Sequence, residues 1–131
     1  MSAIRPLLIL AAAVAAAAPA SCVAGPKPDV EKGKATFGVM CSVCHSTVPT
    51  GGPTVAPNLL GVVGRKAGSQ PDYTQYTPAL KASGITWSVK TLNKFLIAPW
   101  ETVPGTAMPM LIPDDKTRAD VVAYLATLKK P

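Results

Sequence analysis

The stretch Met40–Thr47 reads MCSVCHST and places two cysteines three positions apart, with a histidine directly after the second. Cys41, Cys44 and His45 form one group, and His45 is the only histidine in the chain. Residues three apart on a helical turn lie on the same face, so the two thiols point the same way. His45, one position further on, can bring its imidazole beneath whatever the thiols hold.

This pattern is typical of covalent haem attachment, in which each thiol adds to one vinyl group and the histidine nitrogen binds the iron. A structural zinc site needs four ligands, and the sequence has no second Cys/His pair. A thioredoxin-like pair accompanies a βαβ unit, which is not indicated here, and a short disulfide leaves the histidine unexplained. We therefore expect one haem c, bound through Cys41 and Cys44, with His45 as an iron ligand.

The iron has a second axial position, and no other histidine can fill it. The soft candidates are Met40, Met108 and Met110, because Met1 lies in the N-terminal leader. Met40 adjoins Cys41 on the same helix and cannot reach the opposite side of the haem. The residues alone therefore leave Met108 and Met110, both within the segment PGTAMPM.

The N-terminus has the pattern of a secretory signal. One positive charge, Arg5, precedes an apolar run that ends in the small-residue sequence Ala18-Pro19-Ala20. This run is short for a permanent anchor, which needs ~20 apolar residues. We expect a signal peptide over residues 1–24, cut after Ala20 or Ala24.

The mature domain would then span residues 25–131 and lie in the periplasm, an oxidising compartment. Two alternatives keep the protein on the membrane: an uncleaved signal, or lipidation of Cys22.

Charge is spread along the chain. Lysine and arginine total 13 against 7 aspartate and glutamate, for a formal net charge of +6. The lysines are scattered and form no block of five or six, so a nucleic-acid-binding patch is not indicated.

The fold is expected to be all-α, because no strand pattern is convincing. Helix start and stop signals predict four short helices. They are expected to run from about Asp29 toward Cys44, from Thr77-Pro78 to Gly84, from just after Thr86 to near Ala98, and from Asp114 or Asp115 to Lys129-Lys130. The stretches 46–75 and 98–113 are long, rich in Pro and Gly, and expected to be non-helical. Loops of this length with so thin a core suggest that they wrap around something large and apolar.

An ordered series of segments resembles the class I cytochromes c, the soluble mitochondrial and bacterial electron carriers, over nearly the whole mature chain. The matching segments are DVEKGKATF (29–37), CSVCH (41–45), APNLLGVVGRKAG (56–68), YTPALKASGITW (76–87), PGTAM (104–108) and RADVVAYLATLKK (118–130). The resemblance implies the cytochrome c fold, with about four short helices and long loops around one haem.

The resemblance also implies residue roles. Met108 rather than Met110 would be the second axial ligand, and the Pro57 carbonyl would accept the proton on the other histidine nitrogen. Thr106 would bond near Met108 or a propionate. Three further side chains would hold or neutralise a propionate: Arg65, Tyr76 and Trp87. Where the terminal helices cross, Gly33 and Phe37 would meet Val121 and Tyr124.

Two axial ligands saturate the iron, so the implied function is electron transfer rather than catalysis. The leading interpretation is a periplasmic mono-haem carrier that moves single electrons from a donor dehydrogenase or reductase to an acceptor oxidase. A second is a dedicated cytochrome subunit of a periplasmic dehydrogenase, such as one for sulfite or an alcohol. A third, a haem peroxidase or gas sensor, requires an open sixth position.

The sequence departs from the mitochondrial members at the exposed haem edge, where they carry lysines. Here Met40, Trp100, Glu101, Thr102 and Ala107 stand at those places. We therefore expect a mostly apolar docking rim that includes Met40 and Trp100, with association rates that depend weakly on salt.

Overall fold

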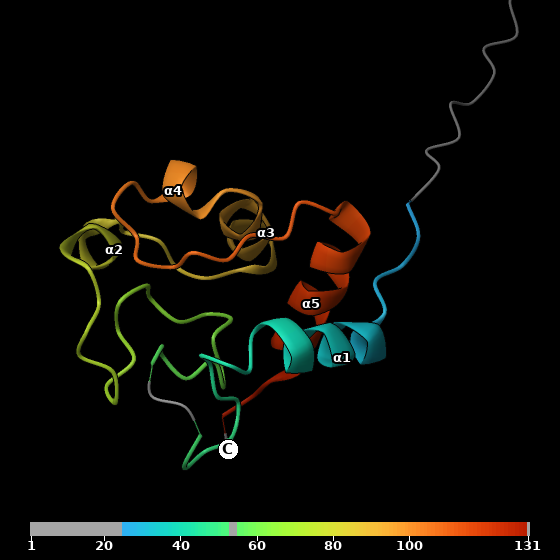
Figure 1. Ribbon diagram of the computed structural model, residues 1–131, viewed down its shortest axis with the longest axis horizontal. Coiled ribbons are helices and arrows are strands. Elements are labelled where there is room, and N and C mark those ends of the chain that lie inside the picture. The colour runs from blue at the N-terminus through green and yellow to red at the C-terminus, as the bar shows by residue number, and fades with distance from the viewer. Residues whose placement is uncertain (1–24, 53–54, 131) are drawn as a thin grey trace, which may run out of the picture.

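The computed structural model describes residues 25–52 and 55–130 (Figure 1). The expected signal peptide and Cys22 lie outside the described residues. Within them the regular structure is helical, as predicted, and the only β-type pairing is an isolated antiparallel bridge between Lys66 and Thr86. None of the helices in these two ranges is long and apolar enough to cross a membrane.

Four of the helix starts follow the sequence closely, because each of these four has a side-chain cap. Asp29, Thr77, Ser88 and Asp114 each accept a hydrogen bond from a backbone N–H of the first turn. The described residues form five helices: α1 (Val30–Met40), α2 (Pro78–Ala82), α3 (Val89–Ile97), α4 (Pro99–Thr102) and α5 (Asp115–Thr127).

The predicted boundaries needed three corrections. The last helix was expected to end on Lys129-Lys130, but α5 ends at Thr127 and is followed by its C-cap, Leu128. The first helix was expected to run toward Cys44, but α1 ends at Met40 and residues 41–44 form turns. The stretch 98–113 was expected to be free of helix, but Pro99 begins the short helix α4. Pro99 disfavours helical geometry at Ala98, so α3 ends at Ile97. Proline is also well suited to the first position of a new helix, where its nitrogen needs no hydrogen-bond partner.

The two terminal helices cross, as the resemblance implied. A Cβ placed on Gly33 would overlap the backbone carbonyl of Asp120, so only glycine allows α1 and α5 to approach this closely. Beside this point the rings of Phe37 and Tyr124 lie 5.5 Å apart between centroids. Asp120 also accepts a hydrogen bond of 2.6 Å from the Asp29 N–H, which ties the start of α1 to α5.

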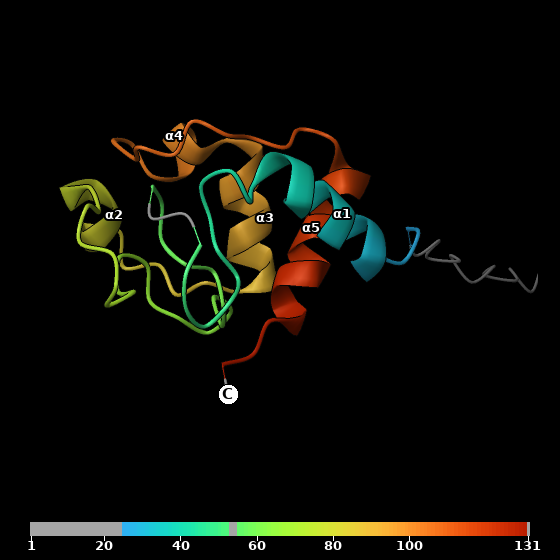
Figure 2. The same ribbon diagram turned by 60° about the horizontal axis from the view of Figure 1, so that its bottom comes forward.

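The remaining elements extend from this crossing. Helix α5 packs on α3, and α3 packs on α4, as Figures 1 and 2 show. The segment between α4 and α5, residues 103–114, passes back across the molecule as an irregular strap. Long loops fill the side opposite the strap, so the two non-helical regions face each other across the interior.

Candidate haem site

The turn after α1 carries both cysteines. Cys41 is the C-cap of α1, and its carbonyl accepts hydrogen bonds from the N–H groups of Cys44 (3.1 Å) and His45 (2.9 Å). Both thiols are free and half-buried. Burial, reinforced by the neighbouring Cys44, raises the pKa of Cys41 to about 11, so this thiol is protonated at neutral pH. The turn therefore presents two thiols and one imidazole as a compact group.

His45 is oriented by the following loop. Its Nδ1 lies 2.7 Å from the Pro57 carbonyl, which can only accept a hydrogen bond, so Nδ1 carries the proton and the lone pair is left on Nε2. Burial lowers the pKa of His45, and the imidazole is neutral at physiological pH. The loop is held in place by a hydrogen bond of 2.8 Å from the Leu59 N–H to the Ser46 carbonyl. The lone pair of His45 Nε2 is therefore available to bind a metal ion.

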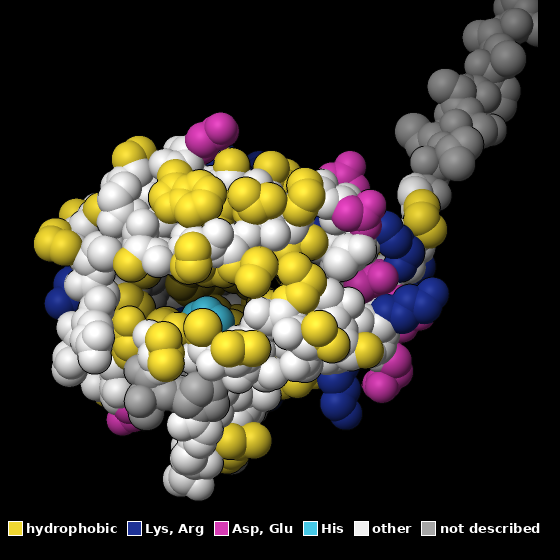
Figure 3. All heavy atoms as spheres, in the orientation of Figure 1, with side chains coloured by type: hydrophobic (Ala, Val, Ile, Leu, Met, Phe, Trp, Pro, Cys, Tyr) yellow, Lys and Arg dark blue, Asp and Glu magenta, His cyan; other side chains and the backbone are white. Residues whose placement is uncertain are grey.

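A hollow opens on this face, and the histidine is visible inside it among hydrophobic side chains (Figure 3). Comparison with the ribbon in the same orientation places the strap above the hollow and the loops after α1 below it. The strap carries Met108, which is half-buried and packs against the same hydrophobic core as Cys41. The buried Thr106 accepts a hydrogen bond of 3.4 Å from the Met108 N–H, so it fixes the local turn of the strap.

Arg65 and Tyr76 meet through a residue that the sequence analysis missed. The Arg65 guanidinium donates to the Asn58 carbonyl (2.7 Å), the Leu60 carbonyl (3.2 Å) and Gln70 Oε1 (2.8 Å). The Gln70 N–H donates to the Tyr76 hydroxyl at 3.3 Å. Gln70 is buried, but it lies in a polar loop with no periodicity, so nothing in the sequence marked it.

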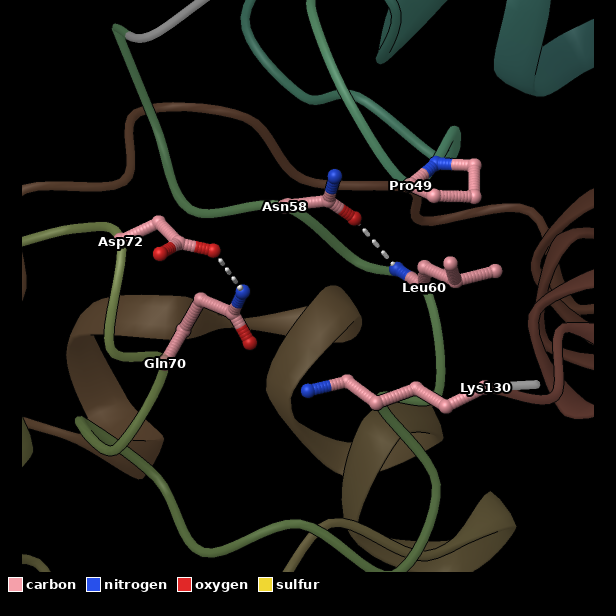
Figure 4. Close-up of a pocket in the computed structure, with 6 residues that line it drawn as sticks. All are labelled: Pro49, Asn58, Leu60, Gln70, Asp72 and Lys130. Carbon is pink, nitrogen blue, oxygen red and sulfur yellow. Dashed lines mark hydrogen bonds between the residues drawn. The ribbon is translucent and has the colours of Figure 1, made fainter.

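The outer side of this cluster is a small polar pocket (Figure 4). Its lining residues are Pro49, Asn58, Leu60, Gln70, Asp72 and Lys130. The Gln70 amide donates to Asp72 at 3.3 Å, and Asn58 Oδ1 accepts from the Leu60 N–H at 2.7 Å. The bond to Asp72 orients the Gln70 side-chain carbonyl toward Arg65. The pocket residues therefore help to hold the Arg65–Gln70–Tyr76 cluster in place.

Trp87 is brought beside Arg65 by backbone pairing. The Trp87 N–H donates to the Arg65 carbonyl at 2.9 Å, and the Gly64 N–H donates to the Trp87 carbonyl at 2.7 Å. The Trp87 ring is buried and packs edge-on against Phe95, with the centroids 5.1 Å apart. These backbone bonds thus place Trp87 next to Arg65, although the two residues are far apart in the sequence.

The residues fit a haem. The hollow is lined by apolar side chains, and several half-buried ones pack around the core from different segments: Met40, Leu59, Val63, Leu80, Ile85 and Met108. A large planar apolar group would complete their burial. The same region holds two free thiols and an imidazole nitrogen whose orientation is already set.

A family model described as Cytochrome c matches residues 30–129. The chain belongs to the cytochrome c family. Cytochrome c2 of Rhodomicrobium vannielii is 45% identical over 100 residues, covering 76% of this chain and 78% of that protein. Cytochrome c of Tetrahymena pyriformis is 44% identical over 104 residues, covering 79% and 92%.

Among solved structures, cytochrome cH from Methylobacterium extorquens is similar, with a TM-score of 0.67 and 41% identity, covering 76% of this chain and 98% of that one. The chain is therefore a class I mono-haem c-type cytochrome with the cytochrome c fold. Its cofactor is covalently bound haem c, for which the Cys-x-x-Cys arrangement of Cys41 and Cys44 is present, and its role is electron transport.

Proposed function

We propose that this cytochrome is a periplasmic carrier of single electrons whose haem is linked to Cys41 and Cys44 and ligated by His45 and Met108. The observation that carries the proposal is the orientation of His45, whose Nδ1 is held 2.7 Å from the Pro57 carbonyl so that Nε2 is free for iron. Met108 is the preferred second ligand because its side chain packs on the core that also contacts Cys41.

Haem supplies one-electron chemistry, and the protein supplies orientation and a dry environment. With both axial positions occupied by side chains, no substrate can bind the iron, which favours a carrier over an enzyme. A thioether ligand and an apolar pocket both favour the reduced state, so a positive reduction potential is expected.

Arg65, Tyr76 and Trp87 are proposed to serve the haem propionates. The Arg65–Gln70–Tyr76 cluster supports this proposal because it holds a guanidinium next to a phenol hydroxyl, two groups that can donate to a carboxylate. Thr106 is proposed to act near Met108, because its hydroxyl oxygen accepts a hydrogen bond from the Met108 N–H.

Replacing the sixth ligand tests the proposal. Reduced wild-type protein should fail to bind carbon monoxide, whereas Met108→Ala should bind it and lose the far-red charge-transfer band of thioether-ligated ferric haem. Met110→Ala is the matched control, since Met110 is also half-buried on the strap, and it should keep the band and exclude carbon monoxide. Binding of carbon monoxide by the wild-type protein would instead favour a peroxidase or gas sensor.

A second function, a cytochrome subunit held by a periplasmic dehydrogenase, is favoured by one feature. The side chain of Trp100 is 48% exposed on α4, where a free carrier gains little from a large apolar group. Affinity purification of the mature protein from periplasmic extract separates the two, because a dedicated subunit would copurify with a larger chain in fixed stoichiometry.

A further inference from the structure

The segments that border the hollow carry no charge. Residues 41–64, which include the haem turn and the loops below the hollow, contain no Asp, Glu, Lys or Arg, and neither do residues 102–113, which include the strap above it. In Figure 3 the blue and magenta side chains lie toward the edges of the view, and hydrophobic and uncharged groups surround the hollow. The charged side chains therefore belong to other segments of the chain.

Large apolar side chains are exposed on these two segments and on α4, which adjoins the strap. We define the apolar rim as Val43 (70% exposed), Val48 (50%), Val55 (68%), Trp100 (48%) and Leu111 (38%). Trp100 lies on α4, next to the start of the strap. Met40 was expected here as well, but it is half-buried and packs against the core, so it is left out. Single exposed apolar residues are ordinary, but this set comes from the segments around one opening.

We propose that the apolar rim is the docking surface for a redox protein whose own electron-exchange face is apolar and uncharged. The inference rests on the proposed electron-carrier function, because electrons would leave through the hollow that the rim surrounds. An acidic partner would have to strip water from its carboxylates with no cation on the rim to pair with them. An apolar partner gains about 25 cal/mol for each Å² of apolar surface that both sides bury.

Association through this surface has a kinetic signature. Without charges at the contact, long-range steering is weak, and the rate should be about 10⁵–10⁶ M⁻¹s⁻¹ and nearly independent of salt. Charges outside the rim are separated from the contact and are screened beyond about 8 Å at physiological ionic strength.

The test uses the mature holoprotein on gold electrodes coated with methyl-terminated or carboxylate-terminated alkanethiol monolayers. Wild-type protein should exchange electrons faster on the methyl surface, with less than about a twofold change in rate as screening increases from low to high salt. A preference for the carboxylate surface with a steep loss in salt would overturn the proposal.

Two lysine variants add the same charge at different places. Val48→Lys, at a rim residue that lies outside the attachment motif, should slow exchange on the methyl surface about tenfold, equivalent to about 1.4 kcal/mol. Val89→Lys is the matched control, because Val89 is 49% exposed but lies beside Lys90 on α3, outside the rim, and it should behave like wild type. Equal effects of the two variants would contradict the inference. Trp100→Ala, which adds no charge and lies outside the attachment motif, should also slow exchange on the methyl surface.

Two controls separate the other outcomes. A small soluble mediator should exchange electrons with every variant at the wild-type rate; failure of the wild-type protein in this assay would reject the carrier function itself rather than the rim. Sedimentation and binding to phosphatidylcholine vesicles identify other occupants. If the wild-type protein dimerised or bound vesicles and Val48→Lys did not, the rim would be assigned to a second copy of the chain or to lipid, and the proposal would be overturned.

Discussion

At the scale of single residues, one glycine decides how the terminal helices meet. Gly33 faces the backbone of α5, and an added Cβ would overlap the Asp120 carbonyl. Because the obstacle is backbone rather than a flexible side chain, neither helix can relieve the overlap without moving as a whole. Gly38, five residues further along α1, has nothing within 4 Å of such a Cβ.

These two glycines make a matched pair of variants. Gly33→Ala should lower the free energy of unfolding of the holoprotein by at least about 1–3 kcal/mol, since overpacking of a close contact costs this much or more. Gly38→Ala should raise it by about 0.5–1 kcal/mol, because alanine loses less entropy in a helix. Guanidinium unfolding followed by circular dichroism measures both, and similar values for the two variants would refute the close-contact argument.

At the scale of elements, the strap that carries Met108 is fastened to α5 by Arg118. This side chain is buried, and its guanidinium donates to the carbonyls of Ile112 (2.9 Å) and Pro113 (3.0 Å). The Ile112 N–H donates to the Leu96 carbonyl of α3 at 2.7 Å, so the end of the strap is held by two helices. Asp115 pairs with Arg118, but its own side chain is 91% exposed.

Arg118→Lys should loosen the strap, because a single ammonium cannot reproduce the planar set of donors. Loss of the bonds to these two carbonyls, of which the Ile112 bond is buried, should cost about 1–3 kcal/mol. The far-red band attributed to Met108 ligation should disappear at lower guanidinium concentration than in wild type. Asp115→Asn removes only an exposed partner and should change the free energy of unfolding by less than about 1 kcal/mol. If both variants lost the same stability, the bonds from Arg118 to the strap would not explain the effect.

A second element-scale feature is the junction between α1 and α5, which predicts a pH dependence. Hydrogen bonds from Lys116 (2.6 Å) and from the Asp29 N–H lower the pKa of Asp120. A carboxylate with a lowered folded-state pKa stabilises the fold above its unfolded pKa, and this contribution is lost as the pH falls through the folded value.

Unfolding free energies measured between pH 7 and pH 3 should therefore fall more steeply for wild type than for Asp120→Asn below about pH 5. The variant should also be less stable than wild type at pH 7, because an amide cannot pair with Lys116 as a carboxylate does. Glu101→Gln, which alters an exposed carboxylate on α4, serves as the control and should follow the wild-type curve. Parallel curves for Asp120→Asn and wild type would show that this carboxylate does not contribute.

At the scale of the whole molecule, the chain builds only part of its own core. The buried cluster draws residues from α1, α3, α5 and the loops between them, while Leu59, Leu80, Ile85 and Met108 are only half-buried. Burying one such side chain fully is worth about 1.5–3 kcal/mol, and domains of this size are stable by only about 5–15 kcal/mol. The haem therefore completes the core as well as carrying the electron.

Cys41→Ala/Cys44→Ala, produced without attached haem, should consequently lose most of its helical circular dichroism and its cooperative thermal transition. Cys41→Ala alone, which retains one thioether, should lie between this variant and the holoprotein. The measurement is circular dichroism at matched concentration. A native-like, cooperative transition in the double variant would show that the polypeptide core suffices without haem.

Local chemistry was readable from the sequence. Caps at Asp29, Thr77, Ser88 and Asp114 act on their own first turns, so three of the four expected helices start within two residues of the expected place and the one expected after Thr86 starts at Val89. The Cys-x-x-Cys-His spacing is also local, and it led to haem c and to a fold that wraps around it. The crossing of the terminal helices was available only through the resemblance, which orders distant segments.

Contacts between distant segments were decided by the tertiary structure. The role of Gln70 depends on where Arg65 and Tyr76 converge, and the burial of Arg118 depends on the strap, whose Ile112 carbonyl accepts a hydrogen bond from its guanidinium. A single residue reports its own conformational preference, whereas a buried hydrogen bond depends on the positions of two segments at once. The sequence by itself therefore determined the cofactor, the helix starts and the family, and only the folded chain decided which polar groups hold the loops around the site.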